Sequence, residues 1–227
     1  MRERIVELLK NTKERIIGQD RYVNSAVLIA IAEFEGKEYI VLEKRAAEIR
    51  QGGEISLPGG KCDKKDKNSE ETAIRETIEE LGIPREKIEV TGKLGILVNP
   101  SGMILEVYVG FVRLENREDI KYNRDEVERV IFAPIEFFLK NEPRIEKIGI
   151  KNVPQFSTEE LGLPKRYHGD WQGNPREVYF YNFHGDIVWG MTAEIILDFI
   201  KMLKIEYHYD IVLLFKANKN DESFIKT

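Results

Sequence analysis

The segment from Leu57 to Ile83, LPGGKCDKKDKNSEETAIRETIEELGI, constrains the fold more than any other stretch of the chain. On a helix with ~100° per residue, its apolar side chains Ile74, Ile78 and Leu81 fall on one face. The acidic side chains on the opposite face are Glu76, Glu79 and Glu80. Neighbouring anions repel one another and destabilise a bare helix, and a bound divalent cation would remove that penalty. Hard ions such as Mg²⁺ and Mn²⁺ prefer carboxylate oxygens, so a metal-binding helix is one interpretation of this pattern, and a solvated acidic face is the commoner alternative for such a helix taken alone.

The sequence also predicts where this helix begins and ends. Asn68 or Ser69 can cap its first turn, because short polar side chains accept hydrogen bonds from free backbone amides there. Gly82 can close the helix in a left-handed conformation, and Pro84 prevents continuation. We therefore expect a helix between positions 69 and 81.

A glycine turn precedes the helix. Residues 54–57 are expected to form a short strand that stops at Pro58, Gly59 and Gly60. Two successive glycines permit close approach of the backbone to a ligand and leave amides free to face phosphate. The turn and the helix together therefore predict a site for a metal ion and a phosphorylated ligand.

The second half of this segment resembles the Nudix box, Gly-x5-Glu-x7-Arg-Glu-U-x-Glu-Glu-x-Gly-U, where U is bulky and apolar. The matching positions are Arg75, Glu76, Thr77, Glu79, Glu80, Gly82 and Ile83. The first half departs from the box, because Asp66 stands where a glutamate is expected. Eight residues, instead of seven, separate Asp66 from Arg75.

The departures resemble the coenzyme A pyrophosphatase branch of that superfamily, which reads roughly GGxxDxxD and then TALRExxEE. Upstream, residues 44–58 resemble the branch signature KRSxxLRxHxGExxFPGG, although this loop is one residue shorter and lacks the histidine. Residues 99–103 and 187–193 resemble two further segments of the branch. The similarity runs from about position 26 to position 199.

This resemblance implies an α/β fold of the α+β type, an α/β/α sandwich around a mixed β-sheet. It also implies an enzyme that hydrolyses a diphosphate linkage in a nucleoside diphosphate derivative, with Mg²⁺ or Mn²⁺ as cofactor. Coenzyme A or its thioesters are the first candidates, with 3′,5′-ADP and 4′-phosphopantetheine as products. Two alternatives stay open: hydrolysis of ADP-ribose, NADH or dinucleoside polyphosphates, and a nucleotide-sensing module without catalysis. The intact box glutamates favour an enzyme.

The predicted roles within the site follow from the charges. Glu76 and Glu80, one helical turn apart, are the expected metal ligands, and Glu79 is either a third ligand or the general base. Arg75 is expected to orient a carboxylate. The predicted substrate-binding residues are Arg45, Arg50, Gly59, Gly60 and Lys61. For Arg45 and Arg50 a surface salt bridge is an equal alternative. Candidates for a further metal ligand or general base from outside the helix are Asp125, Glu126 and Glu128, although for each of them individually a role outside the site is favoured.

The remaining sequence is read as one domain over residues 1–227. A helix at about 2–16 is expected to turn Ile5, Leu8 and Leu9 inward, and 204–227 form an extension in which 207–215 is rich in strand formers. The proline-containing segment 141–175 is expected to be a long surface excursion. The other expected strands are 25–34, 38–43, 87–98, 103–114 and 130–132, with one or two more over 177–189. The other expected helices are 134–139 and 191–203.

Composition limits the partners. The formal charge of −5 disfavours nonspecific binding to nucleic acid, and no apolar run reaches the length of a membrane span. The single cysteine, Cys62, excludes an internal disulfide framework and favours a reducing cytoplasm. The charged N-terminus lacks the apolar core of a signal peptide. We therefore expect a cytoplasmic protein that binds a small nucleotide substrate and neither nucleic acid nor membrane. Pairing as a homodimer stays open.

Overall fold

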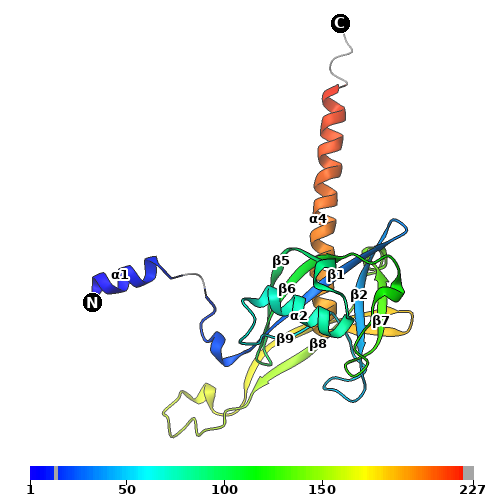
Figure 1. Ribbon diagram of the computed structural model, residues 1–227. Helices are drawn as coiled ribbons and strands as arrows, with labels where there is room; N and C mark the ends of the chain where they lie inside the picture. The colour runs from blue at the N-terminus through cyan, green and yellow to red at the C-terminus, as the bar shows by residue number, and fades with distance from the viewer. Residues whose placement is uncertain (13–14, 222–227) are drawn as a thin grey trace.

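The computed structural model describes the backbone of residues 1–12 and 15–221, with side chains up to position 205. Within these residues, seven strands form the central sheet, in the order β3-β2-β1-β6-β5, with β4 beside β1 and β7 beside β2 (Figure 1). β1 and β6 run parallel and the other pairs antiparallel, so the sheet is mixed, as predicted. The strands are β1 (Val23–Phe34), β2 (Lys37–Arg45), β3 (Ile55–Ser56), β4 (Gly59–Lys61), β5 (Ile88–Asn99), β6 (Met103–Val112) and β7 (Val127–Pro134).

The strand β1 runs through the centre of the core. Its apolar residues are continuous because both of its faces are covered. Leu28 and Ala30 pack on the side of α2 (Ser69–Leu81), whereas Ile29 and Ile31 pack on the opposite side. The predicted strand 25–34 is therefore confirmed, with a start at Val23.

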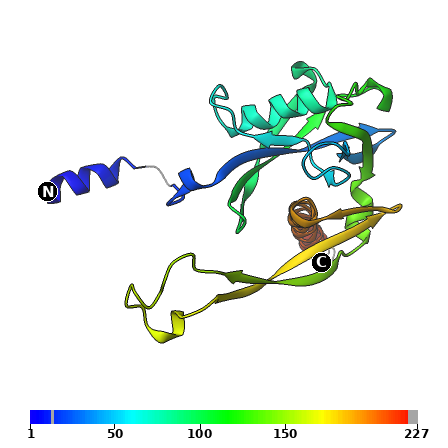
Figure 2. The same ribbon diagram turned by 90° about the horizontal axis from the view of Figure 1, so that it is seen from below.

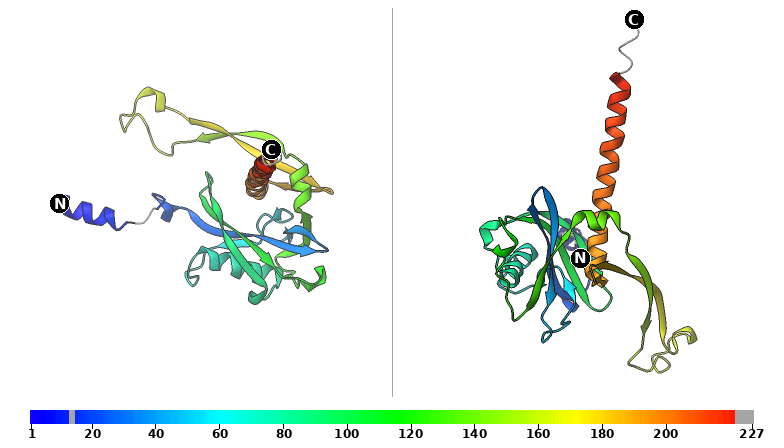
Figure 3. Two further views of the ribbon diagram at one scale, coloured as in Figure 1. Left: turned by 90° about the horizontal axis from the view of Figure 1, so that it is seen from above. Right: turned by 90° about the vertical axis from the view of Figure 1, so that its right-hand side faces the viewer.

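Helices cover both faces of this sheet. α2 contributes Ile74 and Leu81 to one core cluster, and α3 (Ile135–Lys140) contributes Phe138 to the other. α4 (Gly190–Asp221) adds Ile196 and Ile200 to the second cluster. Figure 3 shows α2 and α4 on opposite sides of the sheet. The predicted α/β/α sandwich is confirmed.

A second sheet lies beyond α4 (Figure 2). It has the order β10-β9-β8 within the described residues, and the strands are β8 (Arg144–Asn152), β9 (Trp171–Phe183) and β10 (Asp186–Trp189). The prediction of a surface excursion over 141–175 was therefore wrong for β8 and the start of β9. Pro175 suggested a loop, but it lies in β9 opposite the register shift between Ile148 and Ile150, where a strand tolerates proline.

Both ends of the chain differ from the prediction. α1 (Arg2–Lys10) is shorter than the expected 2–16, and none of its residues is buried, so Ile5, Leu8 and Leu9 do not face inward. The helix lies apart from the sheets (Figure 1), and no surface of the described chain covers its apolar side. At the other end, residues 207–215 are rich in strand formers, but they belong to α4, which continues to Asp221. None of the described helices is both long enough and apolar enough to cross a bilayer.

Candidate active site

The helix α2 has the ends that its sequence predicts. Asn68 Oδ1 accepts a hydrogen bond from the Glu71 amide at 2.9 Å. Gly82 adopts φ 65° and donates its amide to the Ile78 carbonyl at 2.9 Å. Ile74 is buried against the sheet, so the helix is fixed along its length and presents its carboxylates from a rigid element.

Glu80 is buried and does not lie on an exposed face of this helix. Only 3% of the residue is exposed, and its Oε2 accepts a hydrogen bond from the Gly59 amide at 2.8 Å. The predicted short strand does end before Pro58, since β3 covers Ile55–Ser56, but Gly59 and Gly60 then form a strand of their own, β4, that pairs with β1. A side chain at Gly59 would collide with the backbone carbonyl of Ala26. The glycine turn therefore lies close enough to the sheet to cover Glu80.

A second buried carboxylate faces Glu80 from β2. Glu43 is fully buried, and its Oε1 accepts a hydrogen bond from Ser56 at 3.0 Å, while its Oε2 has no partner in the described structure. The Arg45 Nη1 atom lies 3.5 Å from Glu43 Oε1 and 3.8 Å from Glu80 Oε1. Burial raises the pKa of Glu43 to about 7. Burial and the charge of Glu43 raise the pKa of Glu80 to about 9.

Glu76 lies beside this pair and against the glycine turn. A Cβ atom at Gly60 would come within 2.5 Å of the Glu76 carboxylate carbon, so only glycine leaves room for that side chain. Glu76 Oε1 accepts a hydrogen bond from Arg75 Nη1 at 2.9 Å. Burial raises the pKa of Glu76, and the interaction with Arg75 opposes that rise.

Arg75 joins the helix to the preceding loop. Its Nε and Nη2 atoms bind the two carboxylate oxygens of Asp66 at 3.0 and 3.1 Å. Its Nη1 also binds Glu79 Oε2 at 3.1 Å, and its Nη2 binds the Lys61 carbonyl at 3.2 Å. The guanidinium holds the pKa of Asp66 well below its usual range. Asp66, which replaces the expected box glutamate, thus serves as an anchor for Arg75.

Comparison with known proteins decides the family. Residues 23–155 match the family model of the NUDIX domain, which is more than half of the chain. The chain belongs to the Nudix family. The resemblance noted in its sequence is therefore confirmed.

Curated relatives of this Nudix chain occur in plants and animals. It is 30% identical over 186 residues to Nudix hydrolase 15, mitochondrial, of Arabidopsis thaliana, covering 78% of this chain and 58% of that protein. It is 32% identical over 179 residues to Nudix hydrolase 22, chloroplastic, of the same plant, covering 76% of this chain and 53% of that protein. The matched regions thus span little more than half of these relatives.

Two further similarities are narrower. A peroxisomal coenzyme A diphosphatase of Mus musculus is 34% identical over 115 residues, covering 50% of this chain and 48% of that protein. Among solved structures, a MutT/nudix family protein from Enterococcus faecalis aligns with 15% identity and a TM-score of 0.45, covering 87% of this chain and 67% of that one.

The Nudix site fits a divalent cation, which Nudix hydrolases generally use. No three metal-ligating side chains among the described residues are already arranged as a closed metal site. Arg75 binds Glu76 and Glu79, and the Gly59 amide binds Glu80. Within the described residues, the buried Oε2 of Glu43 nevertheless lacks a partner. The two buried carboxylates of Glu43 and Glu80 also share the positive charge of the Arg45 guanidinium. Such a set of hard oxygen donors suits Mg²⁺ or Mn²⁺.

The predicted substrate-binding residues divide into two groups. Arg45, Gly59 and Gly60 surround the buried carboxylates. Arg50 and Lys61 have exposed side chains, and each contributes a backbone carbonyl instead, to Arg45 and Arg75 respectively.

Sequence reasoning missed Glu43. In β2 its side chain shares a face with buried Val41, and a charged residue on a buried face of a strand is a usable signal of a site. Of the acidic residues between 125 and 128, Glu126 adds negative charge that raises the pKa of Glu43 and of Glu76. Glu128 is instead paired with Lys44 at 2.8 Å.

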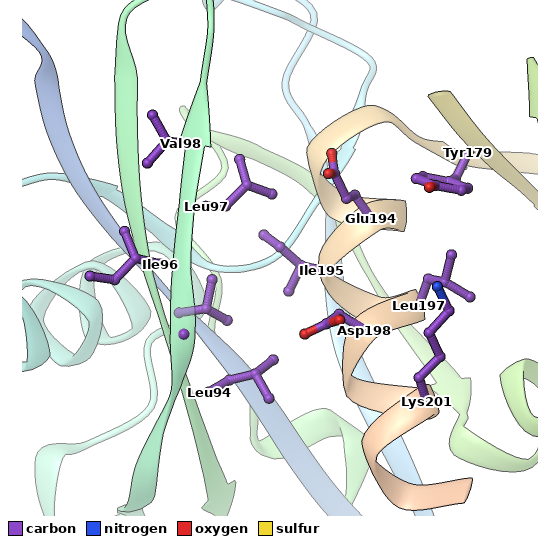
Figure 4. Close-up of a pocket in the computed structure, with 12 residues that line it drawn as sticks. Leu94, Ile96, Leu97, Val98, Tyr179, Glu194, Ile195, Leu197, Asp198 and Lys201 are labelled. Atoms are coloured by element: carbon purple, nitrogen blue, oxygen red, sulfur yellow. The ribbon is translucent and has the colours of Figure 1, made fainter. Parts of the chain in front are cut away.

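A separate pocket of about 390 Å³ lies between β5 and α4 (Figure 4). Leu97 and Ile195 line it together with the polar residues Glu194, Asp198 and Lys201. It opens on the α4 face of the central sheet, whereas the carboxylates of the candidate site lie on the α2 face. This pocket is therefore not part of the carboxylate site.

Proposed function

We propose that this protein hydrolyses the diphosphate linkage of a nucleoside diphosphate derivative, with coenzyme A or its thioesters as the leading substrates. The observation that carries the proposal is the buried pair of Glu43 and Glu80 beside Glu76, under a glycine turn. Water attack on one phosphorus would give 3′,5′-ADP and 4′-phosphopantetheine, or its acyl derivative. The similarity to a coenzyme A diphosphatase supports this substrate.

In this proposal Glu76, Glu80 and Glu43 hold Mg²⁺ or Mn²⁺, and Glu79 is the remaining box carboxylate. When bound, the cation supplies charge neutralisation of the diphosphate and a more acidic water. Arg75 positions Glu76 and Glu79 by hydrogen bonds, and Asp66 positions Arg75. Gly59 and Gly60 let the phosphate approach the backbone closely, while the Gly59 amide itself is held by Glu80.

The proton of the attacking water needs an acceptor. Glu79 is proposed as the general base because its side chain is 52% exposed and therefore open to solvent and substrate. Glu126 is the second candidate, because its charge acts on Glu43 and Glu76 from outside the helix. Separate Glu79→Gln and Glu126→Gln variants distinguish them: the variant that lacks the base loses kcat and keeps metal affinity.

A substrate panel tests the proposal. Purified protein with Mg²⁺ or Mn²⁺ is offered coenzyme A, acetyl coenzyme A, ADP-ribose and NADH, and the products are identified by mass. We expect coenzyme A or its thioester to be cleaved fastest. Faster cleavage of ADP-ribose contradicts the substrate assignment. Tight nucleotide binding without cleavage of any diphosphate contradicts the enzymatic function and favours a sensor.

The variant Glu80→Gln tests the site itself. The amide oxygen of glutamine can still accept from Gly59, so the fold is retained while a metal ligand is lost. Turnover should fall by roughly 100-fold or more. Glu89→Gln, on the exposed side of β5, is the matched control and should keep wild-type rates. Full activity in Glu80→Gln would overturn the site assignment.

A further inference from the structure

A groove of about 630 Å³ lies behind the short edge strand β3, where the β9–β10 hairpin approaches the central sheet. Gly52, Gly53 and Ile55 form one wall, and Phe180 and Trp189 form the other. The two walls come from segments more than 120 positions apart in the sequence, and β3 and β10 are in direct contact.

The aromatic wall is a rigid platform. Trp189 and Phe180 are directly opposite each other across β9 and β10, with ring centroids 6.0 Å apart and an angle of 5° between the ring planes. Phe180 therefore backs one face of the indole. Trp189 nevertheless remains 42% exposed, so its other face is open to a ligand.

Three charged residues line the groove; Lys44 and Asp186 are paired, and the third, Glu54, is an acid. Lys44 Nζ lies 2.8 Å from Glu128, and Asp186 is bound to Arg129. The glycine wall adds no side chains. A phosphate would find no free cation among these residues, whereas a flat and uncharged ring would find an aromatic face opposite a smooth backbone wall.

The groove and the candidate active site lie on opposite sides of β3. Ser56 donates to Glu43 on the α2 side, whereas its neighbour Ile55, which lines the groove, packs on the α4 side. The Gly53 amide donates to the Arg45 carbonyl at 2.9 Å, and the Arg45 guanidinium lies between Glu43 and Glu80. Because β3 has only two residues, a ligand with its diphosphate at the carboxylates can reach around this edge into the groove.

We propose that Trp189 is the stacking platform for the base of the nucleotide substrate, and this inference rests on the proposed function. The purine ring lies on the free face of the indole, opposite Gly52 and Gly53. Lys44 and Asp186 hold the two walls through their partners on β7 and do not contact the base. The groove thereby selects a nucleoside derivative over other diphosphates.

Kinetics of Trp189 variants test the stacking. One stacked base contributes about 1–3 kcal/mol, so Trp189→Leu should raise KM for the diphosphate substrate about 5- to 150-fold and change kcat little. Trp189→Phe keeps an aromatic face and should stay within about threefold of the wild type. Trp171→Leu, in the far part of the hairpin, is the matched control and should keep KM. An unchanged KM in Trp189→Leu overturns the inference while leaving the hydrolase function intact.

Fluorescence gives a readout that does not depend on turnover. The chain has two tryptophans, so Trp171→Phe leaves Trp189 as the sole indole emitter. Saturating 3′,5′-ADP should quench that emission, and 4′-phosphopantetheine should not. Quenching by 4′-phosphopantetheine alone, or by neither compound, overturns the inference. Quenching by 3′,5′-ADP in a protein that cleaves no diphosphate retains the inference and rejects the proposed hydrolase activity.

Discussion

Replacing Glu43 with glutamine should stabilise the metal-free protein at alkaline pH. Glu43 has a pKa of about 7 in the folded chain against an ordinary value of 4.5. A raised carboxyl pKa stabilises the fold fully below about pH 4.5, and this contribution is lost as the pH rises through about 7. At pH 8 the ionised side chain therefore costs on the order of 3 kcal/mol. Glutamine avoids this cost and can still accept from Ser56.

The assay is urea unfolding at pH 5, 6, 7, 8 and 9 with a chelator present. The wild type should lose stability relative to Glu43→Gln as the pH rises, with a gap of about 2–3 kcal/mol at pH 8 and little difference at pH 5. Glu89→Gln, which changes an exposed carboxylate, should follow the wild type.

Metal should narrow the stability gap between the two proteins. A cation at about one hundred times its dissociation constant stabilises the folded state by about 2.7 kcal/mol. Mn²⁺ should stabilise the wild type by this full amount, and it should stabilise Glu43→Gln by less because the variant has lost an anionic metal ligand. If metal-free Glu43→Gln is no more stable than the wild type at pH 8, Glu43 is not a buried strained carboxylate and the reasoning fails.

Further perturbations address the parts that hold the site. Gly60→Ala would place a methyl group within 2.5 Å of the Glu76 carboxylate carbon and should lower turnover at least about tenfold, whereas Gly149→Ala has open space and should not. Arg75→Lys loses the two-pronged contact with Asp66 and should cost about 2 kcal/mol in urea unfolding. Because Arg75 depresses the pKa of Asp66, stability that is present above about pH 4 is lost on acidification, and acid unfolding of Arg75→Lys should begin at higher pH. Deleting residues 1–10 removes no buried side chain and should change Tm by no more than about 2 °C.

The helix α2 was predictable because its signals are local. The cap at Asn68, the left-handed Gly82 and the apolar stripe are each defined within one or two turns of the sequence. The position of Glu80 was not predictable from the helix alone, since β4 buries it and β4 exists only by pairing with β1. The place of Glu43 on a buried strand face is a signal in the sequence, but its position opposite Glu80 becomes visible only in the folded sheet.

The C-terminal segment shows the limit of residue preferences. Residues 207–215 favour strands, yet α4 continues through them to Asp221. After Gly190 no glycine or proline interrupts the sequence before that point. Extending an existing helix costs far less than nucleating a new element, so the helix that starts at Gly190 imposes its conformation on the residues beyond its first turns. Here continuity along the chain decided the outcome, and composition did not.

The buried carboxylates also indicate what the fold is selected to do. Glu43 and Glu80 face one another with a single guanidinium 3.5–3.8 Å away, which is longer than a strong ionic hydrogen bond. A chain selected for stability alone would replace this pair with apolar side chains of similar volume, because burying a poorly compensated charge costs several kcal/mol. The glycine turn, Arg75 and Asp66 instead hold the carboxylates where they repel one another. That arrangement is destabilising without a cation and favourable with one, so the strain within the metal-free site is best explained as a requirement of its chemistry.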